Sequence, residues 1–271
     1  MSDVAVESPG PEPRDAYEVS AEFYDILQAD RDRARVRRFY GRSVRGARRG
    51  VLDVGAGTGR VTLMSLAESR VPVHAVEPAR SMRSLLMTRL AALPADQRAR
   101  VTVHPDGLDE AGLRAVADVA ICHNTIGCLP PVSRAALWPA VARAVVPGGM
   151  LLVHLPPDRL PAEEATHVLP AQKVGQHVYG GRMVMSADAD RIRTRFDYWV
   201  RGARGVLREY TETFWMWPAS RAEVTGELAG SGFVPLPEGD EPAVLTVRLG
   251  RPDGTGRERA RAGVHRAGVG R

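Results

Sequence analysis

Three closely spaced glycines directly follow a mostly apolar run in the first quarter of the chain. The run at 50–54 reads as a buried strand, and Gly55, Gly57 and Gly59 come next. Because glycine has no Cβ, such a turn can adopt positive φ and bring its backbone into contact with a ligand. Dinucleotide-binding turns have a different spacing, Gly-x-Gly-x-x-Gly, and hold a pyrophosphate. Asp53 would repel a pyrophosphate and attract a cation such as an ammonium or a sulfonium.

Two further acidic residues stand where later predicted strands end. The run 71–76 leads into Glu77, whose carboxylate could accept both hydroxyls of a ribose. The run 101–104 leads to Asp106, which is placed to accept from an adenine amino group. A glycine turn alone could be a mere strand-to-helix connection. Three such strand ends in this order predict a site for a positively charged adenosyl ligand.

These motifs resemble those of class I S-adenosylmethionine-dependent methyltransferases. The resemblance runs from residue 17 to residue 250 and includes the strand that ends at 122–124 and the Pro147-Gly148-Gly149 turn before an apolar strand. The chain is similar to actinomycete tailoring enzymes that methylate amino groups, such as aminosugar N,N-dimethyltransferases and glycopeptide N-methyltransferases. The resemblance implies S-adenosylmethionine as cofactor. The cofactor contacts that it implies are Tyr17, Asp53, Gly55, Ala56, Gly57, Thr58, Gly59, Glu77, Pro78, Met82, Asp106, Gly107, Leu108 and His123.

Strand and helix patterns alternate regularly along this part of the chain. Such alternation is typical of parallel strands with a ligand crevice at their carboxyl ends. The sequence therefore predicts a Rossmann-like α/β fold, with a seven-stranded doubly wound sheet. The expected strands are 50–54, 71–76, 101–104, 118–122, 150–155, 233–236 and 243–249, and the expected helices are 16–40, 59–68, 80–93, 133–145 and 220–230.

After residue 155 the hydrophobic period changes to two, which indicates strands. Alternating runs at 191–200 and 207–217 flank a turn at 202–205, so they predict a long hairpin. With shorter runs at 173–179 and 182–187, an antiparallel β lobe at about 163–217 is expected to be inserted over the cleft. This lobe would supply the substrate pocket, form a homodimer interface, or both. Its candidate substrate contacts are His167, Tyr179, Trp199, Tyr210 and Trp215.

Methyl transfer from a sulfonium requires a positioned nucleophile and the removal of one proton. His123 and Asn124 end the fourth predicted strand, His154 follows the fifth, and Tyr24 lies on the predicted lid helix 16–40. These four are the candidate catalytic residues, although each histidine could equally be structural. An amine needs only a weak base once it is neutral.

The predicted function is N-methylation of an amino group in a small natural product or peptide. O- or C-methylation of a secondary metabolite is the closest alternative. A nicotinamide-dependent oxidoreductase would need a glycine where Arg60 stands. A non-catalytic cofactor-binding regulator is a further alternative from another class.

Composition indicates one catalytic domain at 16–249, because 271 residues with 44% hydrophobic content suffice for a single α/β core. A Pro- and Gly-rich segment 1–15 and an Arg-rich tail 250–271 are predicted to be disordered. The tail contributes +4 of the net +5 charge, which leaves the body near +1 and argues against a nucleic-acid partner. No apolar run is long enough for a membrane span, so we expect no membrane partner and a cytoplasmic enzyme. No carboxylate cluster suggests a metal, and the two cysteines, Cys122 and Cys128, are expected to be reduced.

Overall fold

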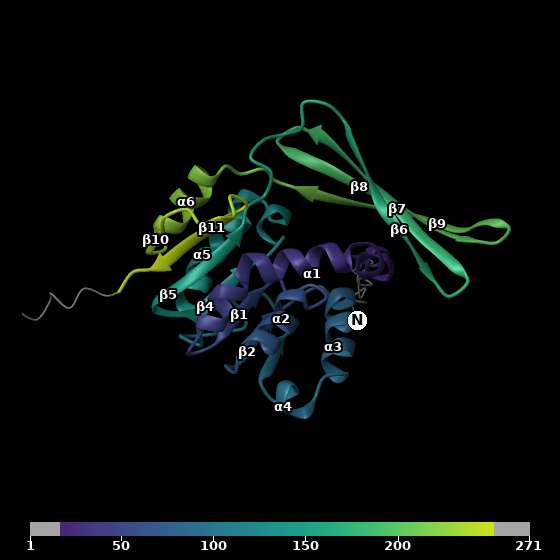
Figure 1. The fold of residues 1–271 in the computed structure, drawn as a ribbon. Helices are drawn as coiled ribbons and strands as arrows, with labels where there is room; N and C mark the ends of the chain where they lie inside the picture. Colours follow the sequence, from purple (N-terminus) through teal and green to yellow (C-terminus); the bar gives the residue numbers. More distant parts are fainter. Residues whose placement is uncertain (1–16, 252–271) are drawn as a thin grey trace, which may run out of the picture.

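The structure, a computed structural model, describes residues 17–251, without the side chains of residues 29–31 (Figure 1). The predictions made for residues 1–15, and for the tail beyond Arg251, lie outside the described residues. Two bodies of secondary structure are visible. One is an α/β body, and the other is a long β lobe that projects from it.

The α/β body is built on a seven-stranded sheet with the order β10-β11-β5-β4-β1-β2-β3. The five strands β1 to β5 pair in parallel, whereas β11 is antiparallel to both β5 and β10. This sheet confirms the predicted Rossmann-like architecture. The strands are β1 Val51–Val54, β2 Val73–Val76, β3 Val101–His104, β4 Ala117–Cys122, β5 Val145–His154, β10 Phe233–Pro235 and β11 Val244–Leu249.

Helices cover both faces of this sheet, because successive strand residues point to opposite faces. Val119 and Ile121 of β4 pack in the core under α1, α2 and α3, whereas Ala120 and Cys122 pack in the core under α5 and α6. The helices are α1 Ser20–Gly46, α2 Arg60–Glu68, α3 Arg80–Ala91, α4 Ala95–Arg98, α5 Pro131–Ala144 and α6 Arg221–Ala229, with a 3-10 turn, η1, at Ile126–Cys128. The predicted lid helix thus starts later than expected and continues six residues beyond residue 40.

The parallel strands end in register at one edge of the sheet. Val54 of β1 pairs with Val76 of β2 and Cys122 of β4, and the latter pairs with Val153 of β5. Val76 pairs with His104 at the end of β3. The residue that follows each of these strand positions therefore emerges at the same edge, which brings the predicted site segments together.

The lobe is a four-stranded antiparallel sheet with the order β6-β7-β8-β9, inserted between β5 and α6. Its strands are β6 Ala165–Val174, β7 His177–Asp188, β8 Arg191–Gly202 and β9 Gly205–Met216. The predicted inserted lobe and its turn between Gly202 and Gly205 are confirmed.

The predicted bounds of the runs 173–179 and 182–187 are wrong, because β6 ends at Val174 and β7 extends from His177 to Asp188. The chain turns at Gly175, which has a φ of +60°, and Gly180 and Gly181 lie inside β7. A Cβ on Gly180 would collide with the Trp199 indole on β8, and one on Gly181 would crowd the Tyr198 ring. These glycines serve close packing within a strand rather than a turn.

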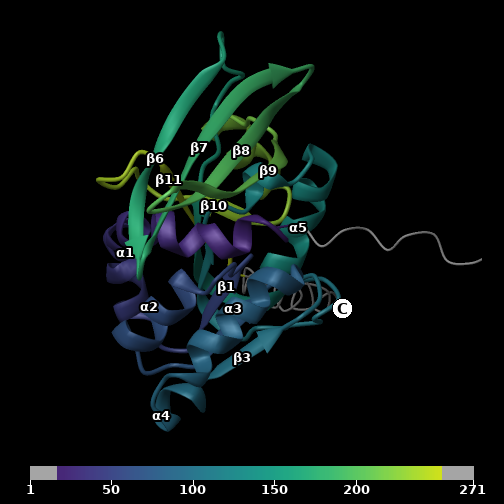
Figure 2. The ribbon, with the colours of Figure 1, turned by 90° about the vertical axis from the view of Figure 1, so that its right-hand side faces the viewer.

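The lobe rests on the first half of α1, as Figures 1 and 2 show from two sides. The Phe23 ring is fully buried and stacks on Tyr198 of β8 with the ring centroids 4.5 Å apart. Glu212 of β9 accepts a hydrogen bond of 2.7 Å from the backbone N–H of Ser20, so a lobe carboxylate satisfies the start of the helix. Leu27 and Leu169 complete this apolar contact.

Candidate active site

A cavity of about 800 Å³ opens at the edge where the parallel strands end. The loops after β1 to β4 line it together with the start of α1 and part of α5. The predicted site residues that line this cavity are Tyr17, Tyr24, Asp53, Gly55, Ala56, Gly57, Thr58, Glu77, Pro78, Met82, Gly107, Leu108, His123 and Asn124. Gly59, Asp106, His154 and the five lobe candidates are not among its lining residues.

The glycine loop leaves backbone open to the cavity. Gly55, Gly57 and Gly59 all have positive φ, at +72°, +56° and +91°. A Cβ on Gly55 would collide with Thr125, and one on Gly59 would collide with Leu86. Around Gly57, by contrast, no heavy atom lies within 4 Å of the Cβ position, so a ligand can approach the backbone there.

Glu77, the predicted ribose acid, also organises this loop. Its side chain is buried, and its carboxylate accepts hydrogen bonds from the backbone N–H groups of Gly57, at 2.6 Å, and Ala79, at 2.8 Å. A carboxylate has about four lone-pair positions for hydrogen bonds. One side chain can therefore hold the loop and contact a ribose.

Asp53 is a buried carboxylate behind the glycine loop, only 1% exposed. Burial raises its pKa to about 7, and a hydrogen bond of 2.6 Å from the Thr62 hydroxyl partly opposes that shift. Because no water solvates the ionised Asp53 carboxylate, a positive charge in the cavity would favour its ionisation. This matches the predicted preference for a cation.

His123 lies at the end of β4 and is held from two sides. Its Nδ1 is 2.9 Å from the Tyr40 hydroxyl, and its Nε2 is 3.3 Å from the Asn124 side-chain nitrogen. Burial lowers the pKa of His123 to about 3, assisted by nearby His154 and by the positive charges of two arginines. His123 is therefore neutral at physiological pH.

Asn124, the next residue, has a φ of +55° in the left-handed region. Asparagine tolerates this conformation better than most residues, and such backbone is enriched at functional sites. Thr125 fixes the turn, because its hydroxyl donates to the Val54 carbonyl at 2.9 Å and to that of His123 at 3.1 Å.

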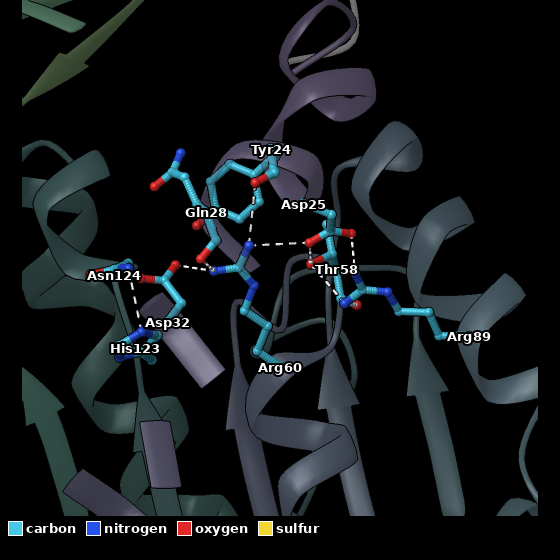
Figure 3. A network of polar contacts seen from close by, with 9 residues as sticks. All are labelled: Tyr24, Asp25, Gln28, Asp32, Thr58, Arg60, Arg89, His123 and Asn124. Carbon is cyan, nitrogen blue, oxygen red and sulfur yellow. Dashed lines mark hydrogen bonds and ion pairs between the residues drawn. The ribbon is translucent and has the colours of Figure 1, made fainter. Parts of the chain in front are cut away.

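An ion-pair network that the sequence reasoning missed joins α1 to the glycine loop (Figure 3). Arg60 donates to Asp32 and, at 3.1 Å, to Asp25, and its guanidinium lies over the Tyr24 ring. Arg89 of α3 pairs with Asp25 and donates to the Thr58 carbonyl at 3.0 Å. The one available signal was the seven-residue spacing of Asp25 and Asp32, which puts both carboxylates on one helix face.

Other lining residues also went unpredicted. Asp109 lines the cavity, whereas Asp106 is exposed outside it. Arg60, Cys128 and Ser133 line it as well. The segment of η1 and α5 that supplies Cys128 and Ser133 carries no motif that could have indicated this position.

His154 packs behind His123, with their ring centroids 5.0 Å apart. Burial lowers its pKa to about 4. The Phe39 ring of α1 also packs against His154, with 5.6 Å between centroids.

The lobe candidates lie away from the cavity. Tyr179 and Tyr210 pack around Phe23, each 5.9 Å away between ring centroids. Trp199 and Trp215 lie under the guanidinium groups of neighbouring arginines, and His167 is exposed on β6. The lobe thus positions α1, which carries the cavity residue Tyr24, and the turn just before α1, which carries Tyr17.

Between residues 17 and 251, no three His, Cys, Asp or Glu side chains gather as metal ligands would. No helix in that range is both long enough and apolar enough to cross a membrane. Both cysteines are free.

Comparison with known proteins identifies the class. Residues 52–151 match the family model described as "Methyltransferase domain". This match covers the glycine loop, Glu77 and His123. Residues 52–151 belong to a methyltransferase domain, and the fold is shared with solved S-adenosylmethionine-dependent methyltransferases. The open Gly57 backbone, Glu77 and the Asp53 carboxylate fit that cofactor.

Several solved structures share the fold at low sequence identity. DesVI from Streptomyces venezuelae is 18% identical, with a TM-score of 0.69, over 85% of this chain and 98% of that one. The sugar N-methyltransferase KedS8 from Streptoalloteichus sp. ATCC 53650 is 22% identical, with a TM-score of 0.64, over 93% and 100%. CalS10, an amino pentose methyltransferase from Micromonospora echinaspora, is 19% identical, with a TM-score of 0.63, over 84% and 95%. No curated protein matches the chain in sequence.

Proposed function

We propose that this enzyme methylates an amino nitrogen of a small molecule or peptide made in secondary metabolism. Asp53, Gly57 and Glu77 would hold S-adenosylmethionine, which would supply an electrophilic methyl group to a neutral amine. The nitrogen–carbon bond would form as the sulfur–carbon bond breaks, adenosylhomocysteine would be the leaving group, and the methylated ammonium would lose its proton to solvent. The chain's own residues position the acceptor and exclude water.

The enclosed position of His123 is the observation that carries this proposal, because its ring lies against that of His154 and its Nδ1 is 2.9 Å from the Tyr40 hydroxyl. A hydroxyl must lose its proton as it reacts, so it needs a base whose pKa lies near the working pH. His123 has a pKa of about 3 and is therefore a weak base. A neutral amine already has a nucleophilic lone pair, so a weak base suffices.

The similar structures support the acceptor class. Two of them are named as methyltransferases of an amino pentose and of a sugar nitrogen, and the glycopeptide N-methyltransferase MtfA is a third, at 21% identity and a TM-score of 0.52. The nearly neutral body of the chain favours a small acceptor over a nucleic acid.

A paired acceptor panel tests the proposal. The full-length chain is incubated with S-adenosylmethionine and with matched amines and alcohols, namely aminosugars with their hydroxyl counterparts and peptides with free or acetylated amino termini. Mass spectrometry should show a methyl group added to amines alone. Methylation of the alcohols, with the amines untouched, would refute nitrogen as the target.

Two controls separate cofactor binding from acceptor choice. Adenosylhomocysteine at a hundred times its Kd should stabilise the fold by about 2.7 kcal/mol, whereas NADH should not. His123→Ala should lower turnover more than it lowers cofactor affinity, because His123 lines the cavity at the end of β4, where we expect the acceptor to bind. An unchanged rate would remove His123 from the reaction.

A further inference from the structure

Tyr40 of α1 is a buried tyrosine whose hydroxyl meets His123. The side chain is 0% exposed, and its oxygen lies 2.9 Å from His123 Nδ1. Within residues 17–251, this hydroxyl has no second polar partner. Burial raises the pKa of Tyr40, so the phenol keeps its proton throughout the physiological range.

The proton of this hydroxyl decides the form of the imidazole. A buried O–H group that donates to nothing costs about 1–3 kcal/mol. His123 Nδ1 is the acceptor within reach, so the hydroxyl donates to it. A neutral imidazole that accepts at Nδ1 carries its own hydrogen on Nε2.

The other groups around His123 keep it neutral. His154 of β5 stacks against it, and Arg35 of α1 and Arg60 of α2 place positive charge nearby. All three disfavour an imidazolium. What is left to determine is which nitrogen holds the hydrogen.

Asn124 is compatible with a hydrogen on Nε2. Its amide nitrogen is placed 3.3 Å from Nε2, but amide oxygen and nitrogen are interchangeable in such assignments. With the amide turned over, its oxygen would lie 3.3 Å from Nε2, a long contact that leaves the Nε2–H to be shared with an acceptor molecule in the cavity. His123 and Asn124 both line the cavity.

We propose that Tyr40 is a positioning residue that fixes His123 with its hydrogen on Nε2, so that His123 offers the acceptor molecule a hydrogen-bond donor and no base. His123 Nε2–H then donates a hydrogen bond to an oxygen, or to another atom with a lone pair, on the acceptor molecule. His123 takes no proton from that molecule. The part played in the reaction rests on the proposed function, whereas the form of the imidazole does not.

Nitrogen NMR of the full-length chain labelled with ¹⁵N-histidine tests this directly. The His123 signals are assigned by their loss in His123→Asn. In the native protein Nδ1 should resonate as an unprotonated nitrogen and Nε2 as a protonated one. The native spectrum with a protonated Nδ1 would overturn the proposal without any variant.

Tyr40→Phe then tests the cause. Without the hydroxyl, Nδ1 should become partly protonated, and kcat should fall about tenfold, while the cofactor Kd stays within about twofold, because the cofactor residues are untouched. Tyr198→Phe is the matched control, since it removes an equally buried hydroxyl, bonded to Ser20 at 3.0 Å, and should leave the His123 signals unchanged. An unaltered His123 spectrum in Tyr40→Phe would reject the assigned role. These spectra report on His123 even if the acceptor panel rejects an amine.

Discussion

At the scale of single residues, burial changes the pKa of Asp53 in a way that would couple its ionisation to the binding of a cation. The carboxylate is shut away from water, so the free protein holds it with a pKa of about 7 instead of 3.8. A cationic cofactor bound beside Asp53 would stabilise the charged form. The same shift makes Asp53 destabilising when ionised, so its contribution to stability is lost as pH rises from about 4 through about 7.

This placement predicts a pH-dependent cofactor affinity. Below pH 7 the cofactor must first displace a proton from Asp53, so S-adenosylmethionine should bind about tenfold more weakly at pH 6 than at pH 8. Titration calorimetry across this range measures the change. The dependence should flatten in Asp53→Asn, which has no proton to displace.

Thr62→Val provides a matched control for the same carboxylate. Losing the 2.6 Å hydrogen bond from the Thr62 hydroxyl removes the interaction that lowers the pKa of Asp53. The inflection of the affinity curve should therefore move to higher pH. A curve of the same shape in Asp53→Asn and in the native chain would show that another group causes it.

At the scale of secondary-structure elements, α1 is fastened across the glycine loop by charge. Asp25 meets arginines from two different helices, Arg60 of α2 and Arg89 of α3. Arg60 is only 10% exposed and pairs with both Asp25 and Asp32, so its removal would take a buried positive charge from between two carboxylates. Arg89 is 29% exposed, so its substitution should destabilise the protein less than substitution of Arg60.

Arg89→Met should loosen the lid without unfolding the protein. The change removes the pairing with Asp25 and the bond to the Thr58 carbonyl, so α1 is held less firmly over the cavity. Cofactor dissociation should accelerate about tenfold, which corresponds to ~1.4 kcal/mol. Stopped-flow release of S-adenosylmethionine measures it.

Arg80→Met is the matched control for this lid prediction. Arg80 is also on α3 and is exposed, and its side chain has no polar partner in the described part of the chain. Its substitution should leave dissociation unchanged. Equal acceleration in both variants would indicate a general charge effect instead of a fastened lid.

The sequence predicted the secondary-structure elements better than it predicted the contacts between them. The strands that end at Val54, Val76 and Cys122 are short, buried and followed by glycine or polar residues, which is enough to place their ends at one edge. His154 shares that edge but packs behind His123 and against Phe39, a tertiary outcome that strand order alone does not determine.

The roles of the lobe glycines and the partners of the ion pairs were harder to predict from the sequence. Gly180 and Gly181 allow both a turn and close packing, and only the rings on β8 decide between them. Likewise, Asp25 pairs with Arg60 and Arg89 from distant segments, so the network depends on how α1 crosses α2 and α3. The local sequence pattern does not determine how α1 crosses α2 and α3.

At the scale of the whole molecule, α1 connects the lobe to the cavity, because it contacts both. The lobe packs on Phe23, and Tyr24, the next residue, lines the cavity, as does Tyr17 just before the helix. The Tyr17 ring also stacks on Phe214 of β9, with centroids 4.7 Å apart. The position of the lobe should therefore affect cofactor binding even though its predicted substrate residues lie outside the cavity.

Phe23→Ala tests this coupling. Removing a fully buried ring should cost about 3–5 kcal/mol of stability, and most of that loss falls on the contact between α1 and the lobe. Because Tyr17 and Tyr24 lose their support, the Kd for S-adenosylmethionine should rise about tenfold, measured by calorimetry at a temperature where the variant is folded.

Phe233→Ala supplies the comparison that separates coupling from general destabilisation. Phe233 is 2% exposed and lies on β10 at the far edge of the sheet, so its loss should cost similar stability. Its contacts belong to the core under α5 and α6, away from α1 and the lobe. Cofactor affinity should therefore stay near native in Phe233→Ala. If both variants bind equally weakly, the lobe acts on the cavity only through overall stability, and the α1 connection is incidental.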